Sequence, residues 1–360
     1  MLVVLTVIIC YLRGIVKSRY NYWKERNVPY LEPTFPFGNF ENILISKKPP
    51  SIIFREFYQH FSDLGAKYGG IYTLCTPTFL PIDPELMKCI LTKDSAHFLH
   101  RGFYANEKDQ PISAHLFSLE GTKWKILRGK LTPSFTPLKL KEMYPILQHY
   151  GDNLKALVKS YVSRQSPIKL RAVACKYTVD VIGSCVFGIE CDCLKSDGEN
   201  AMSTHGRQAV HETTMLIKNT FCFSFPNFAR KIGIKVFSSE TERFFKDIVK
   251  STLEHRIENN VKRNDLFQTL IDMHERGRAG DTSEGLTMDE VTAQCLLFYI
   301  AGFDTSATTL MFALYELAQN EECQLKLKQE IRTTMEKCNG KISYEVMSEM
   351  KYLDAVVTGK

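Results

Sequence analysis

The chain has 360 residues, of which 44% are hydrophobic, and this length is enough for a large core and about two domains. Its net charge of +6 comes from 46 Lys and Arg against 40 Asp and Glu, and the excess is spread along the chain without a long basic run. This pattern argues against a partner nucleic acid, but a basic surface can still meet an acidic protein or an anionic membrane face.

The 11 cysteines are scattered, and many stand in apolar stretches. This is typical of reduced, buried thiols in a cytosolic domain. Cys191 and Cys193 form a C-x-C pair, but no second pair stands at zinc spacing, so the sequence predicts no zinc site.

Residues 1–16 are predicted to form an N-terminal membrane anchor. The apolar MLVVLTVIICYL is followed by Arg13, Lys17 and Arg19, whereas a signal peptide places its basic residues before the apolar core. Basic residues after the core favour retention of the remaining chain in the cytosol. As a helix the anchor is only about 24 Å long, against a hydrocarbon core of about 30 Å. An in-plane or incompletely spanning anchor, or a buried first helix, stays open.

A basic and proline-rich connector is predicted over residues 17–38. Pro29, Pro33 and Pro36 each favour extended backbone and disfavour a helix there. The connector would hold a single mostly helical domain, residues 39–360, close to the membrane.

That domain is predicted to begin with a little sheet and to continue almost wholly as helices. An amphipathic helix over Ser51–Tyr68 precedes two short strands, Gly70–Cys75 and Thr78–Ile82. The helices expected after about Thr122 are Lys123–Lys130, Leu138–Val162, Leu170–Phe187, Gly198–Lys218, Ser238–Val261, Leu266–His274, Met288–Ala318, Glu321–Lys337 and Tyr344–Val357.

Two loops are predicted between these helices. Phe221–Pro226 is aromatic and contains a proline, which indicates a loop. Gly277–Thr287 is glycine-rich and expected to be flexible, and Thr287 with Glu290 forms a capping-box pattern for the next helix.

The helix expected over Met288–Ala318 has an unusual centre, YIAGFDTSATT, inside an apolar run. It would be about 46 Å long and, being apolar on every side, is expected to run through the core. Gly302 removes a side chain where something flat could press on the backbone. Asp304 and Thr305 are then a candidate proton-donor pair in a shallow groove. A helix kink with a carboxylate paired elsewhere explains these residues equally well.

A second candidate site lies in GTKWKILRGKL, where Trp124 and Arg128 are four residues apart on one helix face. An indole N–H beside a guanidinium suits a carboxylate or phosphate. Taken alone, a surface Trp–Arg stack is the simpler interpretation.

The two motifs are more informative together. AGFDTS at 301–306 resembles the A/G-G-x-D/E-T-T/S signature of the central helix of cytochrome P-450 monooxygenases, and WKILR at 124–128 resembles the W-x-x-x-R of the same family. The segments HRGFYANE, LRGKLTPSFTPLKLKEM and MKYLDAVV are also similar to that family. The resemblance covers nearly the whole chain and is closest to insect microsomal members that metabolise xenobiotics. It implies a mostly α fold with a small β-sheet near the N-terminus.

The resemblance implies a role for each motif residue on the central helix. Ala301 and Gly302 would let haem b and oxygen lie against the helix. Thr305 would hydrogen-bond the dioxygen, and Asp304 would relay protons for O–O cleavage.

Outside that signature, the resemblance implies that Trp124, Arg128 and Arg101 bind the haem propionates, and that Phe117 and Ile300 face a lipophilic small-molecule substrate. The partners implied are an NADPH-dependent flavin reductase and membrane lipid. The location implied is the cytosolic face of the endoplasmic reticulum membrane.

The sequence departs from the family at the axial ligand. The family binds iron through a Cys thiolate, in the motif F-x-x-G-x-R-x-C-x-G near its C-terminus. None of the 11 cysteines has Gly four residues before it and Arg two before it, and Cys338 matches only the C-x-G half. After MKYLDAVV the family continues into E-x-x-R, whereas Thr358, Gly359 and Lys360 follow here. The expectation is a fold that lacks the C-terminal haem-binding segment, with the metal ligand missing.

Three functions are therefore weighed. The first is a haem-dependent monooxygenase that inserts one oxygen atom from O2 into lipophilic substrates such as xenobiotics. The second is a catalytically incomplete, membrane-tethered remnant or partial gene product that cannot ligate haem iron. The third, a helical membrane-anchored interaction protein, is disfavoured by two family motifs in the right order.

Overall fold

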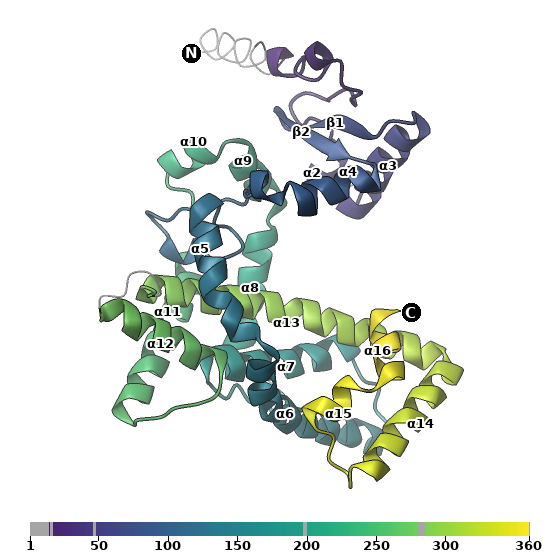
Figure 1. Cartoon of the computed structure of the whole chain (residues 1–360), viewed down its shortest axis with the longest axis vertical. Coiled ribbons are helices and arrows are strands. Elements are labelled where there is room, and N and C mark those ends of the chain that lie inside the picture. The colour runs from purple at the N-terminus through teal and green to yellow at the C-terminus, as the bar shows by residue number, and fades with distance from the viewer. Residues whose placement is uncertain (1–13, 15–16, 46–47, 197–199, 280–284, 360) are drawn as a thin grey trace. The chain divides into compact units, whose positions relative to one another are not determined.

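The computed structural model describes residues 14, 17–45, 48–196, 200–279 and 285–359 (Figure 1). The predicted anchor lies almost wholly outside the described residues. The chain divides into two compact units. The first contains Met1–Gln110, Phe117–Lys125 and Thr213–Val236, and the second contains Pro111–Leu116, Ile126–Glu212 and Phe237–Lys360.

The first unit is built on an antiparallel pair of strands, β1 (Tyr68–Thr73) and β2 (Thr76–Pro81). Helix α3 (Pro50–Asp63) places its apolar face against them. Both predicted strands are confirmed, each about two residues earlier than expected. The core of this unit is formed by Ile43, Ile53, Phe57, Phe61, Ile71 and Ile82.

The predicted connector is attached to this sheet. Trp23 is buried, and its Nε1 donates to the Ile71 carbonyl at 3.0 Å. Tyr30 forms a parallel bridge with Gly70. The backbone between these contacts includes a 3-10 turn, η1 (Lys24–Arg26), so the connector is not extended throughout.

Short helices complete the first unit. One prediction is wrong here: the Phe221–Pro226 segment is helical, because α9 reaches Ser224 and Pro226 begins α10. Proline suits the first position of a helix, where no N–H bond is needed. These helices are α2 (Glu41–Leu44), α4 (Pro84–Lys88), η2 (Cys89–Lys93), η3 (Ser95–His97), α9 (Leu216–Ser224) and α10 (Pro226–Lys231).

The second unit contains helices and, within its described residues, no strand. Its elements are η4 (Pro111–Ser113), η5 (Thr132–Phe135), α6 (Pro137–Ser163), α7 (Leu170–Ile182), η6 (Gly183–Phe187), α8 (Ala201–Thr214), α11 (Ser239–Glu258), α12 (Leu266–Arg278), α13 (Met288–Gln319), α14 (Glu321–Lys337), α15 (Tyr344–Ser348) and α16 (Lys351–Thr358). Helix α5 (Gly121–Leu131) begins in the first unit and ends in the second. The mostly α fold class is confirmed.

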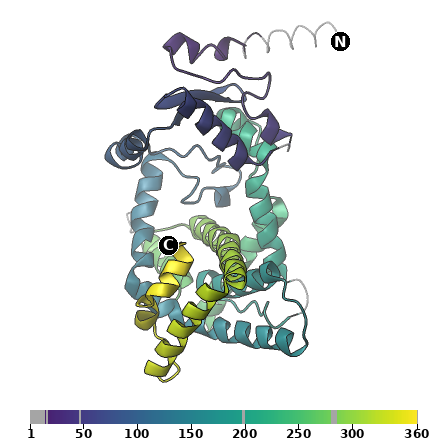
Figure 2. The ribbon, with the colours of Figure 1, turned by 90° about the vertical axis from the view of Figure 1, so that its right-hand side faces the viewer.

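Helix α13 organises the second unit, and Figure 2 looks nearly along its axis. It packs against α7, η4, α11 and α12. Its buried residues end at Ala307, and Phe312 beyond them is 55% exposed. The prediction of a helix buried on every side is therefore wrong for its second half, because apolar composition does not say which faces have neighbours.

In the described part of the chain, α13 is also the one helix long and apolar enough to cross a membrane. The core helix of a soluble protein has the same properties. Within the second unit, α13 packs against α7, η4, α11 and α12, and 28% of its most apolar stretch is buried.

Candidate active site

The central signature lies on α13, whose start is fixed by a capping box. Thr287 Oγ1 accepts from the Glu290 N–H at 3.2 Å, and Glu290 Oε2 accepts from the Thr287 N–H at 2.7 Å. Further along, Tyr299, Phe303 and Ala307 recur every four residues and form the buried face. The residues between them are thereby turned toward α7 or toward the exposed face.

Asp304 faces α7. Its Oδ1 lies 3.1 Å from Nη2 of Arg171, and the two side chains are 35% and 63% exposed. The carboxylate is therefore neither unpaired nor deeply buried. A carboxylate within an apolar helix needs a partner, and Arg171 provides one. The simpler interpretation, a carboxylate paired elsewhere, expected such a contact.

Thr305 lies on the exposed face together with Ala301. Its hydroxyl donates to the Ala301 carbonyl at 2.5 Å. The Thr309 hydroxyl bonds in the same way to the Thr305 carbonyl, at 3.0 Å. This face is thus an exposed strip of small side chains whose hydroxyl hydrogens point back into the helix.

Gly302 lies against α7. A Cβ at this position would be 2.5 Å from Cδ1 of Ile182, so the glycine allows a close approach of the two helices. Gly302 also lines a pocket of about 410 Å³, together with Thr305 and Ser306. Packing therefore explains the glycine, whether or not a ligand enters the pocket.

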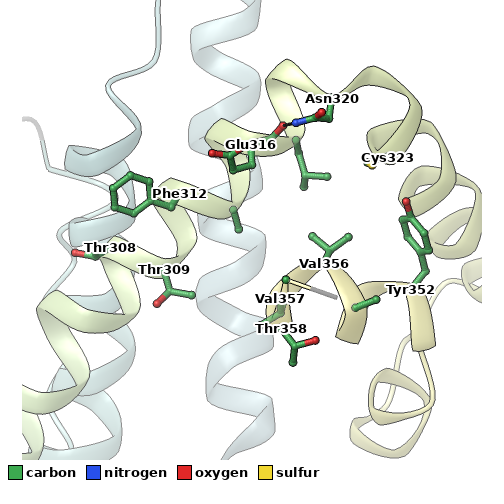
Figure 3. Close-up of a pocket in the computed structure, with 14 residues that line it drawn as sticks. Thr308, Thr309, Phe312, Glu316, Asn320, Cys323, Tyr352, Val356, Val357 and Thr358 are labelled. Atoms are coloured by element: carbon green, nitrogen blue, oxygen red, sulfur yellow. Dashed lines mark hydrogen bonds between the residues drawn. The ribbon is translucent and has the colours of Figure 1, made fainter. Parts of the chain in front are cut away.

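A second pocket, of about 540 Å³, continues along α13 and is also lined by residues of α14 and α16 (Figure 3). Thr309 lines both pockets. Phe312 from α13 and Val356 from α16 contribute apolar surface, while Asn320 donates to the Glu316 carbonyl at 2.8 Å. None of the motifs in the sequence pointed to these residues. Apolar residues continue on one face of α13 after the signature, and this pattern could have indicated the pocket.

The other predicted site residues are distributed between the units. Trp124, half-buried, and Arg128, exposed, both lie on α5. The guanidinium of Arg101 lies 5.1 Å from the ring centroid of Phe117, in the first unit. Ile300 is half-buried on α13. The structure thus groups Ala301, Gly302, Asp304, Thr305 and Ile300 on one helix of the second unit.

The cysteines of the described residues are free thiols, and most of them are buried. Burial raises the pKa of the Cys185 thiol to about 12 and that of Cys193 to about 11. The same cause raises the pKa values of Cys175, Cys191, Cys222 and Cys295. Burial thus favours the protonated form of these six thiols at neutral pH, which is typical of structural cysteines.

The exposed strip fits one side of a haem group. Ala301 and Thr305 leave the helix surface low, so a flat group can approach the backbone, and Thr305 places a hydroxyl there. Asp304, next in the chain, links this turn to a cation and to solvent. An apolar helix with one such polar turn suits a reaction that needs protons at a hydrophobic site.

Comparison with known proteins agrees with this geometry. The family model for cytochrome P450 matches residues 38–358. Probable cytochrome P450 6a23 of Drosophila melanogaster is 35% identical over 99% of this chain and 71% of its own length. Cytochrome P450 6a8 of the same species is 36% identical over 95% and 68%, and cytochrome P450 6A1 of Musca domestica is 35% identical over 95% and 67%. The chain belongs to the cytochrome P450 family of haem-dependent monooxygenases.

Proposed function

We propose that this cytochrome P450 oxidises lipophilic foreign compounds beside the exposed strip of α13, with Thr305 and Asp304 delivering the protons. The observation that supports this most is the single helical turn that joins Ala301, Thr305 and the Asp304–Arg171 pair. Membership of the cytochrome P450 family and the similarity to insect relatives favour an enzyme over a remnant.

The haem group, when bound, supplies the iron at which dioxygen is activated. The residues proposed to hold it are of two kinds. Ala301 and Gly302 keep the helix surface low enough for a flat group. The indole N–H of Trp124 and the guanidinium groups of Arg128 and Arg101 are donors that suit the propionates.

Thr305 and Asp304 have different parts in proton delivery. Because the Thr305 hydroxyl donates to the Ala301 carbonyl, its oxygen faces outward as an acceptor, and it must rotate away from that carbonyl to donate. Asp304 is partly exposed, so its carboxylate is in contact with bulk water. Arg171 holds Oδ1 of this carboxylate and orients it.

A reductase partner and lipophilic substrates follow from membership of the family, and insect relatives of this kind are typically microsomal membrane proteins. Beyond this we propose an NADPH-dependent flavin reductase, contact with membrane lipid, and a position on the cytosolic face of the endoplasmic reticulum. The +6 net charge and the apolar first residues support these assignments. Phe117 and Ile300 are proposed to contact the substrate.

The test is O-dealkylation of 7-ethoxycoumarin by haem-loaded chain reconstituted with an NADPH-dependent flavin reductase. We expect product from the wild-type chain. Asp304→Asn should lower product formed per NADPH by about 100-fold, the lower range for a positioned acid–base group. Asp152→Asn, an exposed site on α6, is the matched control and should change it less than about two-fold. Equal product from the Asp304→Asn variant and its control would contradict the role of Asp304, and no product from the wild-type chain would contradict the proposed activity.

A further inference from the structure

The second pocket, of about 540 Å³, lies entirely within the second unit. It extends beyond the signature along α13, from Thr308 to Asn320, and its other lining residues come from α14 and α16 (Figure 3). Its volume lies within the range of small-molecule sites. The apolar part of its lining consists of Phe312, Ala313, Leu317, Ala355, Val356 and Val357. Size and lining therefore suit a ligand with an apolar body.

The polar side chains of the second pocket offer acceptors to a ligand. The hydroxyl groups of Thr309 and Thr358 each donate to the carbonyl four residues earlier in their own helix, at 3.0 Å and 2.7 Å. Asn320 donates its amide N–H in the same way, at 2.8 Å. The oxygen atoms of these three side chains keep lone pairs for further bonds. Among the described residues, the lining includes no lysine, arginine or histidine. The ligand must therefore bring the donors.

Glu316 gives the second pocket a negative charge. It follows Phe312 by four residues, so the two side chains are neighbours on α13. Within the described part of the chain, its carboxylate forms no ion pair or hydrogen bond. The Phe312 ring beside it is 55% exposed. A carboxylate next to an aromatic ring attracts a cation, because the face of the ring also attracts positive charge.

Tyr352 of α16 contributes a second aromatic ring to the lining. Its hydroxyl group lies beside the Cys323 thiol, and this contact raises the pKa of Tyr352 (Figure 3). The Tyr352 hydroxyl is therefore neutral at physiological pH. The charges that act on it from α14 are those of Glu322 and Lys326, which pair with each other at 2.6 Å and offset each other. Glu316 remains the unpaired charge of the lining.

We propose that the second pocket binds an organic ammonium ion with an apolar body. The ammonium group lies at Glu316 and donates N–H bonds to the acceptor oxygens, while the apolar body packs against Phe312 and Val356. An anion is disfavoured because the carboxylate and the acceptor oxygens repel it. The site does not depend on the proposed monooxygenase activity.

Calorimetric titration of the purified full chain tests the proposal with two ligands of the same shape, 4-phenylbutylamine and the neutral 4-phenylbutanol. Glu316→Gln removes the charge, and Glu336→Gln, at an exposed position of α14 outside the pocket lining, is its control. Phe312→Ala removes the exposed ring, and Leu314→Ala, which is exposed on α13 but does not line the pocket, is its control. Circular dichroism confirms that each variant is folded. Because an amine can also bind haem iron, the Glu316 variant identifies the binding that belongs to this pocket.

We expect saturable 1:1 binding of the amine, and binding of the alcohol that is about five-fold weaker. Glu316→Gln should weaken amine binding by about five-fold, the upper range for an exposed ion pair, and leave alcohol binding unchanged. Phe312→Ala should weaken binding of both ligands by about three-fold or more, because it removes apolar contact area. Each control variant should change binding by less than about two-fold.

Absence of saturable amine binding overturns the proposal. Equal affinity for amine and alcohol overturns it as well, as does an equal loss in Glu316→Gln and Glu336→Gln. Analytical ultracentrifugation tests the other occupant, a second copy of the chain. Self-association that is lost in Phe312→Ala but not in Leu314→Ala would show that a second copy covers the pocket, which also overturns the proposal. If Glu316→Gln does not fold, the comparison of amine with alcohol and the Phe312 variant decide.

Discussion

Asp265 is a buried carboxylate that contacts two helices of the second unit. Its carboxylate is fully buried and forms a bidentate pair with Arg256, at 2.6 Å and 3.1 Å. The same carboxylate caps α12 by accepting from the Gln268 N–H at 2.9 Å. The Asp265 side chain therefore neutralises the buried Arg256 of α11 and accepts a hydrogen bond from the first turn of α12. These two contacts join α11 to α12.

The first prediction separates these two roles. Asp265→Asn keeps a capping oxygen but leaves Arg256 as an uncompensated buried charge. We expect the free energy of unfolding to fall by about 3 to 5 kcal/mol, measured by urea denaturation. Asp192→Asn is the control, because the Asp192–Lys195 pair is exposed and such pairs contribute about 1 kcal/mol or less. Equal small losses in both variants would contradict the argument.

For single residues, the sequence showed which side chains are unusual, but it did not show which side chains they contact. Asp304 and Gly302 stood out because a carboxylate and a glycine are unusual within an apolar helix. Their partners, Arg171 and Ile182, are distant in sequence, and no local pattern connects them to α13. The Asp304 ion pair and the Gly302 packing contact could therefore be found only from the structure.

Among the elements, helix existence was predicted well and helix ends less well. Glu321–Lys337 agrees with α14 at both ends, and Met288–Ala318 differs from α13 by one residue. The expected helix Gly198–Lys218 is instead broken at Met215, whose backbone is not helical. The segment remains apolar across that break, so hydrophobic periodicity gave no sign of it.

The second prediction concerns the start of α13. Thr287→Ala removes the oxygen that accepts from the Glu290 N–H, whereas Thr287→Ser retains it. We expect Thr287→Ala to lower the free energy of unfolding by about 1 kcal/mol and Thr287→Ser to change it by less than half as much. Urea denaturation of the three proteins measures this. A serine variant as unstable as the alanine variant would show that the cap does not stabilise α13.

The whole molecule consists of two units with separate cores. The first is centred on Phe61 beneath β1, and the second is centred on α13. A chain of this length with two cores does not have to unfold in one step. The assignment of segments to the two units alternates along the sequence, so the division does not fall at one point of the chain.

The third prediction is that calorimetry resolves two unfolding transitions. Phe61→Ala, which removes a fully buried ring from the first unit, should lower one transition temperature by roughly 10 °C. Asp265→Asn should lower the other. If both variants shift one shared transition, or if the calorimetric and van't Hoff enthalpies agree for a single peak, the two units unfold together.

The glycine at 302 has a further consequence for the register of α13. Arg171 and Ile182 lie near opposite ends of α7, about 16 Å apart along its axis, yet they contact α13 residues only two apart. Helix α7 therefore crosses α13. If α13 slid by one turn, Ile182 would meet Phe298 or Ser306, and Arg171 would meet Ile300 or Thr308 in place of a carboxylate. The crossing thus fixes α13 along its own axis and holds Thr305 at a constant depth along the exposed strip.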